Sequence, residues 1–503
     1  MSDQELTQIR LGKLQRLREL GHDPYLVEKH DVDFPAQELL ERFEELQDRV
    51  ISFAGRVVAM REMGKAAFAH LSDGESRIQI YVRKDAVGDE LWEVFKLTDL
   101  GDHLGVTGTL FLTKTGEKSI QVTSLTLVSK CLHALPLGKE KEGESWGKLA
   151  DVEQRYRNRH LDLITNPEAR TLLLNRCRIT AAVRRYFDNV GYLEVETPML
   201  QLQAGGAAAR PFMTHYNAYD LDVKLRISLE LYLKRIICGD VPRVYEIGRV
   251  FRNEGVSNRH SPEFTMLEFY EAWSNLETMM QRVEECFEFV GESVFKSTQV
   301  TIGDLEVDFG KPWQRVDLLT EIERHTGLTA ADLSTLESAL QRARELDVPA
   351  KAKALDSWID LNKENNLGGF IEKLLEVFVE PTLQQPTFVV GYPIETSPLA
   401  KKDPSRPGFT RRFEGYIRGK EVCNAFSEIN DPIDQRERFE DQLKQASAGN
   451  DEAHPMDEDF LFALECGMPP TGGCGIGIDR MAMMLTGAEH IREILLFPMM
   501  KPE

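Results

Sequence analysis

The stretch that decides the fold of the larger part of this chain is residues 241–270, which read VPRVYEIGRVF-RNEGVSNRHSP-EFTMLEFY. Its two flanks, 241–251 and 263–270, alternate apolar and polar side chains, and the residues between them are polar. A period of two is typical of a β-strand that buries one face. The stretch therefore predicts two antiparallel strands joined by a long polar loop.

Alternation also gathers functional groups on one side of this strand pair, because residues of equal parity share a face of a strand. Guanidinium groups suit phosphate oxygens, an aromatic ring suits a base, and carboxylates suit a cation, so the set predicts a nucleoside triphosphate site. A solvated network of ion pairs is the alternative. The residues concerned are Arg252, Glu254, Arg259, His260, Phe264, Met266, Glu268 and Tyr270.

A glycine-rich stretch near the C-terminus, GGCGIGIDR at 472–480, adds a second candidate element of the same site. Its small residues would let a ligand approach the backbone closely, and Arg480 at the start of a helical segment could reach a phosphate. The stretch contains neither GxxxxGK[ST] nor GxGxxG after a buried parallel strand, which excludes a P-loop and a Rossmann nucleotide site.

Residues 51–128 show five short alternating segments, at 51–60, 67–71, 76–82, 102–112 and 119–128. One helix-like insert, 90–95, lies between the third and the fourth. Five strands with this insert predict a small closed barrel of the OB-fold type. We expect four parts: a helical extension over 1–48, the barrel over 49–133, a Gly/Lys/Glu-rich linker over 134–150, and an α+β domain over 151–503 with a helical insertion at about 329–380.

Composition excludes several classes of protein. The 503 residues carry 61 Lys and Arg against 82 Asp and Glu, a net charge of −21, which argues against a protein that grips nucleic acid over its whole surface. Apolar runs are too short to span a membrane and the N-terminus is unlike a signal peptide. Seven scattered cysteines without a CxxC indicate a reducing compartment, so we expect a cytoplasmic protein without a membrane partner.

The first predicted helix carries a basic side that could contact a polyanion, although a solvated helix face is the more common explanation. Its basic residues are Arg10, Lys13, Arg16 and Arg18.

Several of these motifs resemble the class II aminoacyl-tRNA synthetases. Residues 251–265 resemble their motif 2, residues 475–480 their motif 3, and Tyr192-Leu-Glu-Val-Glu-Thr-Pro198 their motif 1, a dimer-forming element. In detail the chain is most similar to the lysyl-tRNA synthetase family, along nearly its whole length. The resemblance implies an antiparallel catalytic sheet flanked by helices, an anticodon-reading OB-fold, a homodimer, and the substrates L-lysine, ATP and tRNA(Lys).

For the amino acid, the resemblance implies that Glu230 and Gly206 hold the α-amino end, while Glu268, Tyr270 and Glu428 surround the ε-ammonium. Asn424 and Phe426 line the stem of the side chain. Buried carboxylates left without a cation would reject an uncharged side chain.

For ATP, the resemblance implies that Arg252 stabilises charge on the α-phosphate, Glu254 accepts from the adenine amino group and Phe264 stacks on the ring. The remaining implied ligands are Arg259, His260 and Arg480 for the pyrophosphate, and Glu414 and Glu421 for Mg²⁺. Strict alternation would turn Glu421 away from Asn424, so we expect a bulge or a strand start near 421.

On the barrel, the resemblance implies that Phe68 stacks on an anticodon base, that Gln79 and Glu117 bond to base edges, and that Arg61 contacts backbone or base. Without the resemblance, Phe68 is more simply read as a core residue of the barrel. Two departures lie near the amino-acid pocket: Ser228-Leu229, where relatives commonly have Ala-Pro, and Gly473-Cys474, where Ala and a larger apolar residue are frequent. Both cysteines inside motifs, Cys423 and Cys474, are interpreted as packing residues.

Three alternatives remain beside an enzyme that charges tRNA with lysine. The aspartyl/asparaginyl branch shares the barrel and core, but its substrates need a cationic pocket. A protein-lysylating relative lacks the anticodon barrel, which 51–130 supplies. A non-catalytic paralogue is disfavoured by the presence of Arg252, Glu421 and Arg480.

Overall fold

The computed structural model describes residues 2–141, 144–255, 257–258, 260–447 and 455–502. The chain divides into two compact units, Met1–Arg170 and Thr171–Glu503, and each is described by itself. This division falls inside helix α7 (Pro167–Asn189), beyond the predicted linker at 134–150. In the part of the chain so described, no helix is long and apolar enough to cross a membrane.

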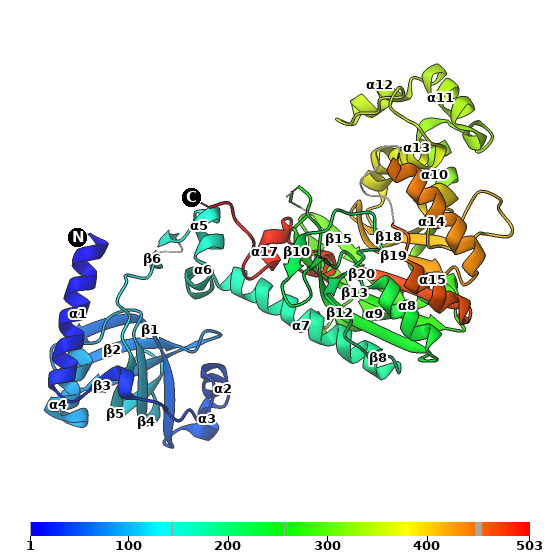
Figure 1. The fold of residues 1–503 in the computed structure, drawn as a ribbon. Coiled ribbons are helices and arrows are strands. Elements are labelled where there is room, and N and C mark those ends of the chain that lie inside the picture. Colours follow the sequence, from blue (N-terminus) through cyan, green and yellow to red (C-terminus); the bar gives the residue numbers. More distant parts are fainter. Residues whose placement is uncertain (1, 142–143, 256, 259, 448–454, 503) are drawn as a thin grey trace. The chain divides into compact units, whose positions relative to one another are not determined.

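The first unit contains a closed barrel of five strands in the order β1-β2-β3-β5-β4, which confirms the predicted OB-fold (Figure 1). Helix α4 (Lys84–Lys96) lies between β3 and β4 in the chain, as the sequence predicts, and its Trp92 and Phe95 belong to the barrel core. The strands are β1 (Val50–Met63), β2 (Ala66–Ser72), β3 (Arg77–Arg83), β4 (His103–Leu112) and β5 (Lys118–Ser129).

Strand β2 shows how alternation builds the barrel. Ala67, Ala69 and Leu71 are buried in the core, whereas Phe68 and His70 between them are only half-buried and face outward. The simpler interpretation of Phe68 as a core residue is therefore wrong, because its parity places it on the outer face.

The N-terminal extension consists of α1 (Asp3–Glu19), a 3₁₀ turn (Pro24–Leu26), α2 (Ala36–Glu41) and α3 (Phe43–Leu46). A capping box formed by Ser2 and Glu5 starts α1. The basic side chains of α1 bond to other groups of the same unit. This favours a structural role for this helix face over contact with a polyanion. Their partners are the carbonyls of Cys131 and His133 for Arg10, and Asp99, Glu93 and Asp23 for Lys13, Arg16 and Arg18.

The rest of the first unit follows the barrel. Strands β6 (Leu137–Lys141) and β7 (Glu144–Lys148) pair within the predicted linker, and the short helices α5 (Val152–Arg157) and α6 (Arg159–Thr165) follow. These elements do not by themselves mark where one domain ends and the next begins, so the predicted domain boundaries stay predictions.

The second unit is built on an eight-stranded sheet in the order β16-β17-β18-β19-β20-β13-β12-β8. Neighbouring strands from β17 to β12 are antiparallel. The two edge strands are parallel to their neighbours: β16 pairs with β17, and β8 pairs with β12. The strands are β8 (Leu193–Glu194), β12 (Arg243–Phe251), β13 (Glu263–Ala272), β16 (Gln314–Asp317), β17 (Thr387–Val390), β18 (Arg412–Ile417), β19 (Lys420–Ser427) and β20 (Thr471–Gly477).

The predicted strand pair is confirmed as β12 and β13, which run antiparallel in register from Arg243↔Glu271 to Phe251↔Glu263. One face of the sheet packs on α7, α9 (Leu276–Phe295) and α16 (Ile478–Thr486), and this core includes Leu267, Phe269 and Ile476. Residues of the other parity point to the opposite face, where the cavity described below lies.

Shorter elements surround this sheet. They are α8 (Glu230–Cys238), α14 (Pro432–Ser447), α15 (Glu458–Glu465), α17 (Ile491–Ile494), and the small sheets β9 (Leu200–Gln201) with β10 (Met213–Tyr216) and β11 (Leu221–Leu225), and β14 (Gln299–Ile302) with β15 (Leu305–Asp308).

A helical region with its own hydrophobic core covers the predicted insertion (Figure 1). Its elements are α10 (Leu318–Thr326), α11 (Leu336–Glu345), α12 (Val348–Ala354), α13 (Leu367–Leu374) and a π-helical turn (Leu375–Val379).

Candidate active site

A cavity of about 580 Å³ opens on the face of the sheet opposite α7, α9 and α16. It lies within the size range of small-molecule sites. The predicted amino-acid and ATP residues that the structure describes all line this one cavity, and Arg259 lies outside the described residues. The lining residues are Gly206, Glu230, Arg252, Glu254, His260, Phe264, Glu268, Tyr270, Glu414, Glu421, Asn424, Phe426, Glu428 and Arg480.

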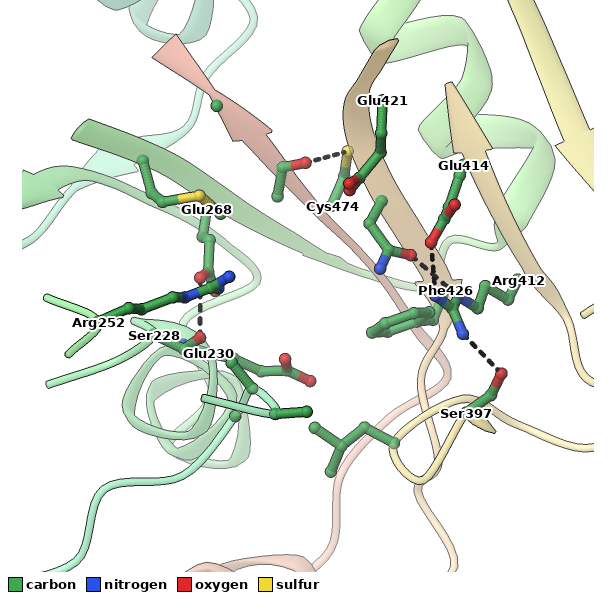
Figure 2. A pocket seen from close by; sticks show the side chains of 18 of the residues that line it. Ser228, Glu230, Arg252, Glu268, Ser397, Arg412, Glu414, Glu421, Phe426 and Cys474 are labelled. Carbon is green, nitrogen blue, oxygen red and sulfur yellow. Dashed lines mark hydrogen bonds and ion pairs between the residues drawn. The ribbon is translucent and has the colours of Figure 1, made fainter. Parts of the chain in front are cut away.

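The cavity has two acidic sides. Figure 2 shows one group of labelled side chains on the side of α8 and another on the side of β18 and β19. The first group comprises Ser228, Glu230, Arg252 and Glu268, and the second Arg412, Glu414 and Glu421.

Strand β20 forms the floor between them because it lacks side chains on this face. A Cβ built on Gly473 would overlap the Glu428 carboxylate and the Tyr270 ring. Gly206 is constrained in another way: its φ of +85° suits glycine, and a Cβ there would lie 2.9 Å from Ser228 Oγ. The departure at Gly473 thus gives the cavity room, and Cys474 beside it is buried, as a packing residue should be.

Glu268 is fixed by three donors. Its Oε1 accepts from Ser228 Oγ at 2.9 Å and from the Leu229 N–H at 3.2 Å, and its Oε2 accepts from the Tyr270 hydroxyl at 3.0 Å. Burial and the charge of Glu230 raise the pKa of Glu268 to about 7, although these three hydrogen bonds oppose the rise. The Glu268 carboxyl therefore changes its protonation state near neutral pH.

Lys234 lies one helical turn beyond Glu230 on α8, and its ammonium group is next to two carboxylates that line the cavity. Its Nζ forms ion pairs with both Glu230 and Glu428, and all three side chains are buried. Burial opposes the charged form of Lys234, but the two carboxylates outweigh it and raise its pKa. The Glu428 oxygens still accept no hydrogen bond of good geometry from any described residue, so this carboxylate can receive a further donor.

Arg252 has the opposite character. Its guanidinium stands over the Phe264 ring, 5.2 Å from the centroid, and forms no ion pair within the described ranges. Burial lowers its pKa, against the attraction of Glu254 and Glu421. A desolvated guanidinium without a salt bridge can bind an anionic group such as a phosphate.

Arg480, at the start of α16, joins the loop between β12 and β13 to β19. Its Nη1 donates to Glu421 Oε2 at 2.9 Å, and its Nη2 lies 3.5 Å from His260 Nε2. Asp479 beside it is fixed by Arg176 at 2.7 Å and by the Thr265 N–H at 2.8 Å, which orients this end of the helix.

The predicted irregularity near 421 is confirmed. Gly415 pairs with Cys423 while the next residue, Tyr416, pairs with Glu421, so Val422 is an extra residue in β19. This bulge shifts the parity of the strand, and Glu421 lines the cavity together with Asn424.

Glu414 is held by three side chains rather than left open. Its Oε1 accepts from Arg412 Nη2 at 2.5 Å, and its Oε2 accepts from the hydroxyls of Tyr392 and Tyr416. Arg412 also donates to Asn424 Oδ1 at 3.2 Å, so it joins the metal side of the cavity to the amino-acid side.

The carboxylates on this side outnumber their cations. Burial and the charge of Glu414 raise the pKa of Glu380 to about 7, and burial raises that of Glu372. Hard carboxylate oxygens under mutual repulsion are the donor set that Mg²⁺ prefers. Glu414 and Glu421 can each offer a carboxylate to such an ion, but within the described residues no group of three or more acidic, histidine or cysteine side chains is arranged to hold a metal by itself.

The outer face of the barrel carries a second candidate site. Phe68 stacks on Tyr81 with ring centroids 4.6 Å apart. Gln79 donates to Glu117 at 2.8 Å, and His70 lies 2.9 Å from the same carboxylate. A ring pair next to a polar network is the arrangement that reads single-stranded bases. Arg61 pairs opposite Phe68 across β1 and β2 and is exposed.

Sequence reasoning missed several residues of both sites. Lys234 and Arg412 are buried charges, and each pairs with a carboxylate of its own element and with a residue of another. Only the i,i+4 spacing of Glu230 and Lys234 is a local signal. Tyr81 was detectable, because it shares the outward parity of Gln79 on β3. The missed residues are Arg412, which lines the cavity, then Lys234, Tyr392 and Tyr416, which contact carboxylates that line it, and His70, Tyr81 and Phe111 on the barrel.

Comparison with known proteins agrees with this geometry. Residues 151–501 match the family described as tRNA synthetases class II (D, K and N), and residues 51–128 match the OB-fold nucleic acid binding domain. The chain is 47% identical to the lysine–tRNA ligase of Thermoanaerobacter pseudethanolicus, with 99% of this chain and 96% of the relative covered. It is 48% identical to that of Bacillus subtilis, with 98% and 97% covered. The lysine–tRNA ligase of Enterococcus faecalis is also 48% identical, with 100% and 98% covered.

Proposed function

This chain belongs to the lysine–tRNA ligases among the class II tRNA synthetases, and we propose on that basis that the cavity between α8, β13, β19 and β20 holds lysine and ATP side by side. The enzyme joins lysine to tRNA(Lys) at the expense of ATP. One observation carries the assignment of the cavity: three buried carboxylates, Glu230, Glu268 and Glu428, converge there beside Arg252, which forms no salt bridge with any residue that the structure describes.

For the amino acid, we assign the α-ammonium to Glu230 near Gly206, and the ε-ammonium to Glu268, Tyr270 and Glu428. When all three carboxylates are ionised, the ammonium of Lys234 and the two ammonium groups of a bound lysine would balance their charges. Asn424 and Phe426 flank the aliphatic stem. A neutral side chain would leave buried charges uncompensated, which is a strong form of discrimination.

For the first step, the lysine carboxylate attacks the α-phosphorus of ATP, and pyrophosphate leaves. Arg252 is placed to stabilise the negative charge that grows on the phosphorus oxygens, and its desolvation strengthens that interaction. Phe264 would stack on adenine and Glu254 would accept from its amino group. Arg480, His260 and Arg259 would hold the departing pyrophosphate.

In the second step, the 3′-terminal ribose hydroxyl of the tRNA attacks the lysyl carbonyl and releases AMP. No side chain forms a covalent intermediate, so the chain contributes position and charge. Mg²⁺ held by Glu414 and Glu421 would supply positive charge to the phosphate oxygens. The network of Arg412, Tyr392 and Tyr416 orients Glu414 for this role.

The pocket disfavours aspartate and asparagine as substrates. Their side chains offer a carboxylate or an amide, and the surface that faces them here is built of buried carboxylates. A substrate anion at this place would meet like charges in a desolvated site.

We assign anticodon recognition to the outer face of the barrel, with Phe68 stacking on a base, Gln79 and Glu117 at its edge, and Arg61 at the backbone or base. The stacked Tyr81 and the nearby Glu117 network support this role. The presence of the barrel distinguishes the chain from relatives that lysylate proteins and lack it.

We further propose that the chain forms a homodimer in the cytoplasm. Strand β8 is an edge strand, and large apolar side chains are exposed next to it, which supports an interface there. They are Leu193, Met199, Leu200 and Leu202. All seven cysteines are free thiols, as in proteins of reducing compartments.

A lysine-dependent exchange of pyrophosphate into ATP tests the first step, and aspartate is the matched control. We expect exchange with lysine alone, and charging of tRNA(Lys) when the tRNA is added. Exchange with aspartate but not lysine would overturn the proposal. Sedimentation of the pure protein tests the dimer.

A further inference from the structure

We propose that Ser228 and the backbone N–H of Leu229 are positioning groups that keep Glu268 ionised and aimed into the cavity, and so set the pH range in which the enzyme binds lysine. The inference rests on the proposed role of Glu268 at the ε-ammonium. It concerns two residues that precede α8 and that the reaction itself does not use.

The geometry makes both groups donors to the same oxygen. Glu268 Oε1 receives the Ser228 hydroxyl at 2.9 Å (Figure 2). It also receives the Leu229 N–H at 3.2 Å. Ser228 Oγ itself accepts the Glu230 N–H at 3.1 Å, which directs its own hydrogen toward Glu268. An amide N–H can only donate, so a proton on Oε1 would face two donors. The arrangement favours the ionised carboxylate.

These donors act against strong opposition. Glu268 is 4% exposed, and two further carboxylates, Glu230 and Glu428, share its cavity. Glu230 adds to burial in raising the pKa of Glu268 to about 7, whereas the Leu229 N–H, Ser228 and Tyr270 lower it. The other ionisable groups that face it are Arg252, Lys234 by way of Glu230, and the thiol of Cys474.

These two hydrogen bonds oppose the rise of the Glu268 pKa, in a cavity where burial also raises the pKa of Glu428 to about 8. Without them Glu268 would take up a proton at a higher pH, and a neutral carboxyl pairs poorly with an ammonium group. Both donors depend on the residues at these two positions, where relatives commonly have Ala-Pro. Alanine at 228 would lack the hydroxyl, and proline at 229 would lack the N–H.

Two variants with matched controls test the idea in the full-length enzyme. Ser228→Ala removes the hydroxyl and Ser228→Thr keeps it; Leu229→Pro removes the N–H and Leu229→Ala keeps it. The KM for lysine in pyrophosphate exchange is measured from acidic to alkaline pH. For Ser228→Ala and Leu229→Pro we expect a KM at neutral pH raised about tenfold, recovery toward the parent value at alkaline pH, and little change in kcat.

Calorimetry of lysine binding in two buffers of different ionisation enthalpy adds a readout that a merely structural role would not move. Near pH 7 the two donor-removing variants should release more protons per lysine bound than the parent and the controls, because more Glu268 is protonated before binding. Ser228→Ala leaves the backbone unchanged, so the test stands even if Leu229→Pro fails to fold.

Two outcomes would overturn the inference, and they are distinguishable. If Glu268→Gln leaves the KM for lysine unchanged, the role of Glu268 and this inference fall together. If Glu268→Gln raises that KM strongly, but the donor-removing variants show the parent's pH profile and proton release, the inference alone is wrong and the proposed function stands.

Discussion

The behaviour of each buried charged side chain in the cavity depends on the groups that compensate its charge. Glu268 is the clearest case, because it accepts three hydrogen bonds but forms no ion pair among the described residues, whereas Lys234 pairs with Glu230 and Glu428. The substrate's ε-ammonium completes the set in our proposal. Energetic effects at this scale follow from desolvation more than from the number of contacts.

Glu268→Gln should weaken lysine activation by about 3–5 kcal/mol, because the amide leaves a buried ammonium under-compensated. The measurement is kcat/KM for lysine in pyrophosphate exchange, with the KM for ATP as internal control. A loss smaller than about tenfold, which corresponds to roughly 1.4 kcal/mol, would count against the assigned role.

Lys234→Met should lower the free energy of unfolding by about 3–5 kcal/mol, because it leaves Glu230 and Glu428 as buried charges without a cation. Denaturation in urea measures the loss. Lys444→Met, which breaks the exposed ion pair with Asp441, is the matched control and should change stability by less than about 1 kcal/mol.

Combining Lys234→Met with Glu428→Gln separates charge from packing. If charge is the cause, the double variant recovers part of the loss, because one uncompensated carboxylate is gone. Strictly additive losses would show that the stem of Lys234 matters only as packing.

At the scale of elements, the bulge in β19 decides which carboxylates reach the cavity. The extra residue, Val422, returns Glu421 to the face that carries Asn424. The need for such a bulge could be argued from parity alone. Its position could not, because it depends on where β18 pairs with β19.

Deletion of Val422 should turn Glu421 away from Asn424 and reduce pyrophosphate exchange at least about a hundredfold, the order expected when a group that stabilises the transition state is lost. Val422→Ala keeps the residue count and is the control, expected to lower stability but to retain most activity. Activity preserved in the deletion variant would show that Glu421 is not needed on this face.

The elements themselves were largely predictable. The five barrel strands, the β12–β13 pair and a helix near Arg480 follow from periodicity and from turn residues, although α16 begins at Ile478, two residues earlier than predicted. The insertion of β20 between β19 and β13 has no such local signal, since glycine-rich segments carry no alternation that could set their register.

At the scale of the whole molecule, our proposal assigns separate steps to the two units. The cavity belongs to the second unit and the stacked Phe68–Tyr81 face to the first. On this proposal, activation of lysine requires the cavity alone, whereas charging requires the tRNA to be recognised as well.

Phe68→Ala should therefore leave pyrophosphate exchange near the parent value and reduce kcat/KM for tRNA(Lys) by about 1–3 kcal/mol, the usual worth of one base stack. Phe68→Tyr retains a ring and should retain charging. Equal damage to both reactions in Phe68→Ala would mean that the ring only supports the barrel.

The sequence alone was enough to predict the reaction class, the barrel and many of the residues that line the cavity, because motif residues and strand parity are local properties of the chain. Only the tertiary structure decided the charge state of the site. Lys234 pairs with Glu428 beyond β19 as well as with Glu230 of its own helix, Arg412 joins Glu414 to Asn424 of β19, and Ser228 with Leu229 donates to Glu268 of β13. Such pairings depend on burial and on distances across the fold, and one-dimensional spacing contains neither.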